Sequence, residues 1–317
     1  MNISYSDPLS RAWDKMKKAL FQPFDLGVWF TLGFTAFLAG LMDGAGGPGG
    51  NNAKFGKSFK DDRFDVDEFL DYPYIAWNWL LEHSFWFSLI IIGIFLAIAI
   101  MIVFTWLSSR GSFMFLDNVI HSRAEVVKPW HEFKEQGNSL FVWRLIYGFI
   151  CFLVICTSLI FSGITLFGIF SNYVPLSTRI FTIIGLVLQF LTLVIIMSYI
   201  SLFLSNFVVP IMYKNKISTS KAWTIFLSVF SKHIGYFLLY GLFIFLLIIV
   251  VVISIIFFGL FTCCLGFLLL IIPYIGSVVM LPISYTFRAF SVEFLEQFGE
   301  DLVIFPKQEE LPEVSSE

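Results

Sequence analysis

The chain has 317 residues, of which 58% are hydrophobic and only 14% charged, and its mean hydropathy is +0.84. Because soluble domains carry about 25% charged residues, this composition excludes an ordinary soluble domain and predicts an all-α integral membrane protein. The net charge of −3 indicates no nucleic-acid partner.

A polar segment with helical spacing precedes the first apolar run. Asp7 can cap a helix there, with Pro8 in its first turn. The apolar residues predicted to share one face are Leu9, Trp13, Met16 and Leu20. A short helix with an apolar face and a Trp suits the membrane interface.

Apolar runs long enough, or nearly long enough, to cross about 30 Å of hydrocarbon recur along the chain. They cover residues 26–42, 84–108, 144–170, 180–209, 235–258 and 266–289. The first is short, and only Gly259 and Gly266 supply turn chemistry between the last two. We predict one six-span domain over residues 1–300, with an outside loop at 43–83 and a disordered acidic tail at 301–317.

A Trp with neighbouring Lys or Arg residues recurs before the third and fifth spans. The three predicted interfacial anchors are Trp13, Trp130 and Trp223. We therefore predict an internal repeat of three units, each an interfacial amphipathic helix followed by a transmembrane hairpin. Coincidence is the alternative, because Trp and basic residues are common beside any span.

Lysine and arginine are concentrated in the segments that would lie on the same side as the N-terminus. The positive-inside rule then places both termini in the cytoplasm of a multi-pass protein. We expect the bacterial inner membrane and contacts between basic interfacial helices and anionic headgroups.

Ionisable residues are missing from the cores of all six predicted spans. This argues against an ion-coupled transporter. No motif for a catalytic set, a metal site or a cofactor is visible in the sequence, so we expect no enzyme activity and no cofactor.

The sixth span contains two prolines around a glycine: Pro273, Gly276 and Pro282. Prolines interrupt the helical hydrogen-bond ladder, and discontinuous helices often line binding sites or pathways. A kink that serves only packing is the alternative.

Polar residues end the even-numbered spans on the predicted cytoplasmic side. A cytoplasmic polar cluster is predicted from Arg110, Asp117, Asn118, Asn206, Arg288 and Glu293. Ordinary anchoring of each side chain in the headgroup region is the alternative. Within the spans, Gln189 is the most polar group and should bond to a neighbouring helix.

The stretches "VVPIMYKNKISTSKAW" and "IPYIGSVVMLPISYTFRAFSVEFLEQFG" resemble a group of uncharacterised bacterial multi-span proteins. These in turn resemble the membrane domain attached to some glycerophosphoryl diester phosphodiesterases. The resemblance covers most of the chain but implies no catalysis, since that activity belongs to a separate soluble domain for which this chain has no matching motif.

Two hypotheses for function remain at this point. The first is a non-enzymatic membrane protein that acts as a scaffold, lipid-interacting protein or accessory subunit, with membrane lipids and an unknown membrane protein as partners. The alternative is a transporter or flippase-like protein for an apolar or amphipathic substrate, whose path is lined by the broken sixth span.

Overall fold

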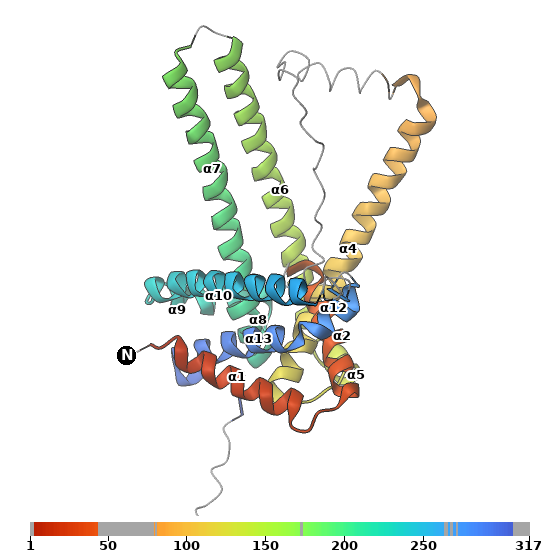
Figure 1. Cartoon of the computed structure of the whole chain (residues 1–317), viewed down its shortest axis with the longest axis vertical. Helices are drawn as coiled ribbons and strands as arrows, with labels where there is room; N and C mark the ends of the chain where they lie inside the picture. Colours follow the sequence, from red (N-terminus) through yellow and green to blue (C-terminus); the bar gives the residue numbers. More distant parts are fainter. Residues whose placement is uncertain are drawn as a thin grey trace, which may run out of the picture. The chain divides into compact units, whose positions relative to one another are not determined.

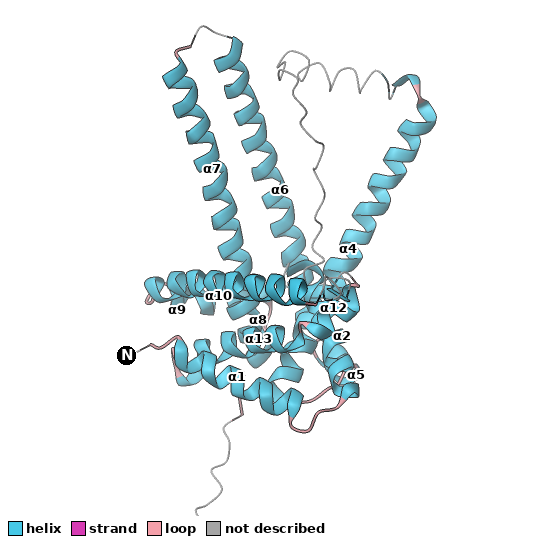
Figure 2. Cartoon of the chain, viewed as in Figure 1, coloured by secondary structure: helices cyan, strands magenta, loops and turns pink. Residues whose placement is uncertain are grey.

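The computed structural model describes residues 3–43, 79, 81–171, 174–262, 266, 269–270 and 272–306. Every regular element in these residues is a helix, as Figures 1 and 2 show, so the all-α prediction is confirmed. The chain divides into two compact units, residues 50–104 and the remainder. Most of the predicted outside loop and residues 307–317 lie outside the described residues.

The first two helices follow the predicted order. Helix α1 spans Ser6–Phe21, and α2 spans Leu26–Asp43. The predicted cap is wrong, because Tyr5 occupies the N-cap position and the Ser4 hydroxyl accepts the N–H of Asp7 at 3.3 Å. Asp7 lies instead in the first turn, where its carboxylate favours the positive end of the helix dipole.

Two middle helices are longer than the spans predicted for them. Helix α4 covers Ser84–His121 and α6 covers Lys134–Ser171, with the short α5 (Val127–Glu132) between them. The predicted bounds, 84–108 and 144–170, follow the apolar residues alone. The helices continue beyond them as segments that are packed against protein.

The predicted span 180–209 is not one regular helix. Helix α7 (Leu176–Phe203) passes into a π-helix, η1 (Leu204–Val208), and then into α8 (Val209–Asn215). The remaining elements are α9 (Thr219–Phe230), α10 (Ile234–Phe261), α12 (Pro273–Val279), α13 (Leu281–Glu296) and the 3₁₀ turn η2 (Glu300–Leu302).

The described residues contain four helices that are long and apolar enough to cross a membrane: α4, α6, α7 continued through α8, and α10. The pair α12 and α13 would be a fifth span, but it is bent by 65°, and α2 is a shorter apolar helix. A helical membrane protein is therefore supported, whereas six complete spans are not confirmed.

Several long helices divide into an exposed apolar part and a buried part. No residue of α4 from Phe85 to Phe104 is buried, whereas every residue from Ser108 to Ile120 is. In α7, burial begins only at Phe203. Apolar surface of this extent needs lipid or another protein as its neighbour. The exposed parts are therefore the parts of these helices that are available to lipid or to another protein.

The core of the larger unit contains an aromatic cluster around Phe207 of η1. Its ring centroid lies 4.8 to 6.1 Å from the centroids of Phe226, Phe237, Tyr240 and Phe294. These residues come from α9, α10 and α13, so one buried ring joins four elements. Such aromatic pairs add about 0.5–1.5 kcal/mol each beyond the area that they bury.

Helices α6 and α7 form an antiparallel hairpin, which is seen side-on in Figure 1. Within it, the Gln189 amide donates to the Ser158 hydroxyl at 3.2 Å, and the Tyr147 hydroxyl donates to the Met197 carbonyl at 2.8 Å. The prediction that Gln189 bonds to a neighbouring helix is confirmed.

The contact between α2 and the buried part of α4 depends on a glycine. A Cβ atom at Gly111 would lie 2.6 Å from the backbone nitrogen of Ala39 and 2.7 Å from the carbonyl carbon of Leu38. Nearby, the Ser108 hydroxyl donates to the Ala39 carbonyl at 2.8 Å. Small residues allow helix backbones this close, so Gly111 sets the spacing of the two helices.

We expect Gly111→Ala to destabilise the fold by about 1–3 kcal/mol, because the added methyl group meets backbone that cannot rotate away. Thermal unfolding in mild detergent measures this loss. The matched control is Gly148→Ala in α6, where a Cβ atom would meet nothing within 4 Å. Helix propensity alone favours alanine by up to about 1 kcal/mol, so equal stability of the two variants would contradict the close contact.

Candidate functional site

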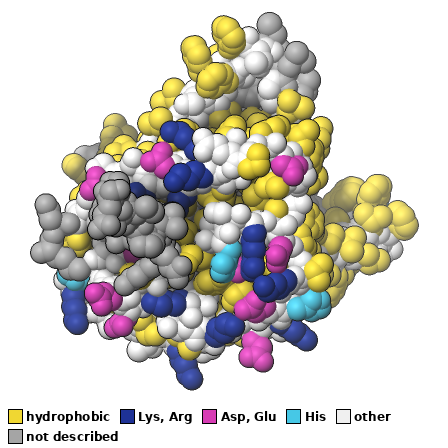
Figure 3. All heavy atoms as spheres, turned by 90° about the horizontal axis from the view of Figure 1, so that it is seen from below, with side chains coloured by type: hydrophobic (Ala, Val, Ile, Leu, Met, Phe, Trp, Pro, Cys, Tyr) yellow, Lys and Arg dark blue, Asp and Glu magenta, His cyan; other side chains and the backbone are white. Residues whose placement is uncertain are grey.

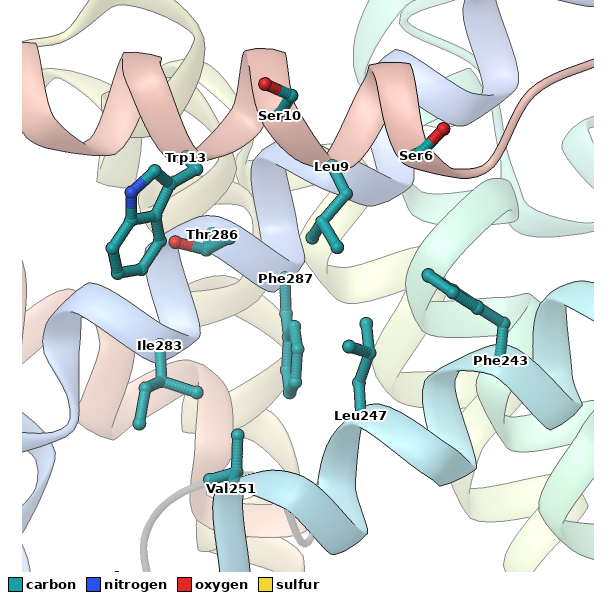
Figure 4. A pocket seen from close by; sticks show the side chains of 10 residues that line it. All are labelled: Ser6, Leu9, Ser10, Trp13, Phe243, Leu247, Val251, Ile283, Thr286 and Phe287. Atoms are coloured by element: carbon teal, nitrogen blue, oxygen red, sulfur yellow. The ribbon is translucent and has the colours of Figure 1, made fainter. Parts of the chain in front are cut away.

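An apolar groove of about 490 Å³ lies between α1, α10 and α13, and we call it the α1 groove (Figure 4). In Figure 4 the side chains of Leu9, Leu247 and Phe287 point toward one another across it. Its lining consists of Ser6, Leu9, Ser10 and Trp13 from α1, Phe243, Leu247 and Val251 from α10, and Ile283, Thr286 and Phe287 from α13.

Helical spacing explains why these residues share the groove. The α10 residues are four apart, at 243, 247 and 251, and in α13 Thr286 and Phe287 follow Ile283 by three and four residues. Residues at these spacings lie on one face of a helix. Each of the three helices therefore offers one stripe to the groove.

Among the described residues, the polar groups in the lining of the groove are three hydroxyls and the indole N–H of Trp13. The Thr286 hydroxyl donates to the Pro282 carbonyl of its own helix at 2.7 Å, and the Ser6 oxygen lies 3.3 Å from that of Ser4. Ser10 is the third. No charged side chain lines the groove, so its walls suit an apolar chain rather than an ion.

Helix α1 divides the apolar face that was predicted for it. Met16 and Leu20 lie in the core together with Ala12, as expected of a core-facing stripe. Trp13 is instead 46% exposed and lines the groove, together with the half-buried Leu9. Trp13 therefore lies at the edge of the predicted face, where it lines the groove and not the core.

A buried carboxylate fastens α1 to α13. The Glu293 side chain is only 6% exposed, and its two oxygens bind Arg11 Nε at 2.6 Å and Lys15 Nζ at 2.5 Å. Two cations compensate the cost of burying this one anion, and the charge-assisted bonds fix the geometry. Glu293 therefore sets the position of the α1 wall of the groove.

Residues before α1 and after α13 add further contacts between these two helices. The Gln297 side chain accepts from the Ser4 N–H and donates to the Ser4 carbonyl, each at 3.0 Å. Glu296 accepts the backbone N–H groups of Ile304 and Phe305, and the Lys15 ammonium lies 3.0 Å from the centre of the Phe305 ring. Residues 301–306 of the predicted tail are thus bound to the domain.

The predicted cytoplasmic polar residues have separate sets of partners in the structure. Asp117 accepts from Arg123 and from the Tyr213 hydroxyl, both at 2.7 Å, and its Oδ1 lies 3.2 Å from His121. The hydrogen bond to Asp117 raises the pKa of Arg123, which keeps this guanidinium charged. Tyr213 belongs to α8, so this network joins α4 to α8.

Two other residues of the predicted polar cluster in α4, Asn118 and Arg110, have other partners. The Asn118 amide donates to the Glu125 carbonyl at 2.9 Å and accepts the Glu125 N–H at 3.0 Å. These two bonds hold the connection after α4. Arg110 donates to Asn138 at 3.2 Å, and its guanidinium carbon lies 4.8 Å from the ring centres of both Trp106 and Trp130. These contacts stabilise its buried charge by cation–π attraction.

Arg288 binds a carbonyl of the π-helix η1. In η1 the Val209 N–H bonds to Leu204, five residues earlier. The same register would pair the Ser205 carbonyl with residue 210, but Pro210 has no N–H. Arg288 Nη1 donates to the Ser205 carbonyl at 2.7 Å. The neighbouring Asn206 is half-buried in η1.

The candidate helix-break residues lie around the bend in α12 and α13. Pro273 begins α12, and Pro282 lies in the first turn of α13, after the bend of 65°. A Cβ atom at Gly276 would lie 2.7 Å from the Leu270 carbonyl oxygen, so only glycine allows this approach. Ile283, which lines the α1 groove, directly follows Pro282 in the sequence.

The three Trp anchors have different surroundings. Trp13 is exposed at the groove, whereas Trp130 packs edge-on against Trp106 at 5.6 Å, and Trp223 stacks on Trp143 at 5.5 Å. Trp130 and Trp223 thus have protein neighbours. Their shared role as interface anchors and the predicted repeat remain predictions.

Sequence reasoning missed both the α1 groove and the pairing of Arg11 and Lys15 with Glu293. The groove residues of α10 are apolar residues in an apolar helix, so no sequence signal separates them from lipid-facing neighbours. The pairing carried a weak signal, since residues 11 and 15 are four apart and share one face of α1. Their partner is remote in sequence and shows no periodic relation to them.

Comparisons with known proteins give a family but no role. No group of three or more His, Cys, Asp or Glu side chains in the described part of the chain could hold a metal ion. A family model described as "Family of unknown function (DUF7544)" matches residues 4–295. No curated protein and no solved structure matches the chain.

We expect Glu293→Gln to loosen α1, because the neutral amide leaves Arg11 and Lys15 without their carboxylate. The cost should be about 1–3 kcal/mol, since both cations keep some exposure to water. Hydrogen exchange of the α1 amides measures the loosening directly. Asp14→Asn is the control, since it breaks only an exposed pair with Lys17 at 3.6 Å. Unchanged exchange in Glu293→Gln would contradict the proposed role of this carboxylate.

Proposed function

The chain belongs to the DUF7544 family, whose function is unknown, and we propose that it is a non-enzymatic integral membrane protein that binds a membrane lipid with the acyl chain in the α1 groove. The observation that carries this proposal is the lining of the groove, which is apolar apart from three hydroxyls and the indole N–H of Trp13. Its volume lies in the range of about 300–1,000 Å³ that is typical of small-molecule sites.

The surroundings of the groove favour a lipid as its occupant. Helix α10 is one of the four membrane-length helices, and its residues next to the groove, such as Leu246 and Val250, are more than half exposed. A lipid chain in the groove would thus remain continuous with lipid around α10. Trp13 adds an amphipathic ring of the kind that is enriched at membrane interfaces.

The proposal includes a topology. In it α2 and the bent pair α12–α13 complete six crossings, and both termini lie on the cytoplasmic side of a bacterial inner membrane. The supporting observation is the concentration of Lys and Arg near the N-terminus and between the hairpins. On this topology, α1 lies on the cytoplasmic side, where its basic residues contact anionic headgroups.

We expect Val251→Trp to reduce lipid occupancy by about tenfold at limiting lipid, because the indole takes space in which methylene groups would each be buried for about 0.8 kcal/mol. Native mass spectrometry of the full chain with added dioleoyl phosphatidylglycerol counts the bound lipids. Val250→Trp is the matched control, because Val250 is the adjacent residue, 59% exposed and not part of the lining. Equal occupancy in both variants and the unmodified protein would contradict a groove-bound chain.

A lipid transporter is the second candidate, and one observation favours it: the bend at the start of α13 lies directly beside the groove. A broken helix at a lipid site could let a headgroup pass a partly unpaired backbone. In this reading the groove is the cytoplasmic end of a path.

We expect Pro282→Ala to slow lipid transfer between leaflets severalfold if the protein is a transporter, because alanine restores an N–H to the helix and favours a straighter α12–α13. Reconstituted vesicles with fluorescent phospholipid measure the transfer. Lipid binding by native mass spectrometry is the control and should persist. No transfer by the unmodified protein would exclude this second function and leave the binding role.

A further inference from the structure

The four cations of α1 differ in the faces on which they lie and in their partners. Arg11 and Lys15 are bound to Glu293. Lys17 follows Trp13 by four residues, so the two side chains lie one above the other on the same face. The Lys17 ammonium is 5.8 Å from the centre of the Trp13 ring. Lys18 lies about 100° further round the helix.

Lys17 is therefore the α1 cation that stands beside the groove. Counting by helical turns, it shares a face with Ser6, Ser10 and Trp13, which all line the groove. Within the described residues it forms an ion pair with Asp14 at 3.6 Å, and the two side chains are 49% and 62% exposed. Such exposed pairs contribute little, so this ammonium can exchange Asp14 for a stronger anion.

We infer that Lys17 selects an anionic phospholipid whose acyl chain occupies the α1 groove: the phosphate group binds at Lys17 and the chain runs past Trp13 between α10 and α13. The inference rests on the proposed lipid-binding function and names the headgroup class. Charge complementarity supports it, because the groove walls are uncharged and Lys17 stands at the end of the α1 stripe.

The alternative is a non-specific electrostatic attraction between a basic protein surface and anionic lipid. Figure 3 shows that Lys and Arg side chains on the face seen from below are intermixed with Asp and Glu. A surface on which positive and negative charges are mixed produces only a weak net electrostatic potential. Lys17 and Lys18 are adjacent and carry the same charge, so they separate local selection from general attraction.

The test is a competition on the full chain in mild detergent, with equal amounts of dioleoyl phosphatidylglycerol and dioleoyl phosphatidylcholine. Native mass spectrometry reads the ratio of the two bound lipids. We expect Lys17→Gln to lower the preference for phosphatidylglycerol by about fivefold, as expected for one basic residue near a phosphate. Lys18→Gln should leave the preference within about twofold of the unmodified protein.

The outcomes separate this inference from the proposed function. An unchanged preference in Lys17→Gln, or an equal loss in Lys17→Gln and Lys18→Gln, would overturn the headgroup assignment while groove binding remains. Loss of lipid in Val250→Trp as well as Val251→Trp would count against the groove itself. Inorganic phosphate in excess is a further arm: displacement of the lipid by phosphate alone would show a simple anion site and overturn the lipid assignment.

Discussion

The pairing of Glu293 with Arg11 and Lys15 is the interaction on which the candidate site depends. A short polar helix beside a membrane can drift in the interface unless something fixes it. Here one buried carboxylate takes two cations from successive turns of α1, at 2.6 and 2.5 Å, and so fixes both its position and its rotation. Fixed rotation is what turns Leu9 and Trp13 toward α10 and α13 and forms the α1 groove.

Because the rotation of α1 is fixed, the cations on its different faces have different partners. The cations that face α13 are used to hold the helix, so they cannot also neutralise a headgroup without releasing it. Lys17 has only an exposed partner and stands beside Trp13. A charge-reversal experiment that changed all the lysines together would therefore mix loss of the fold with loss of lipid contact, whereas single neutral substitutions keep the two apart.

Hydropathy was enough to predict a helical membrane protein and the order of its long helices, because lipid exposure requires unbroken apolar runs. It placed the end of α4 too early, since Ser108 and Ser112 are polar yet remain helical by bonding to carbonyls and to Arg144. The predicted polar cluster remains a prediction, although Asp117, Asn118 and Arg110 each have identified partners that one sequence does not reveal. No pattern in one sequence distinguishes Val251, which lines the groove, from the exposed Val250.

Helix α13 contacts both the π-helix η1 and α1. Arg288 contacts the Ser205 carbonyl in the π-helix, and Glu293 holds α1. The bend of 65° sits at the start of the same helix, so a change at the bend would move both contacts and the groove wall between them. Suppose that α13 has two conformations that differ at the bend. A ligand in the α1 groove would shift the equilibrium between them by the difference in its affinity for the two conformations. On the proposed function, lipid binding and the geometry of the bent pair α12–α13 would be coupled through α13, and an effect of either on the other is expected to be reciprocal.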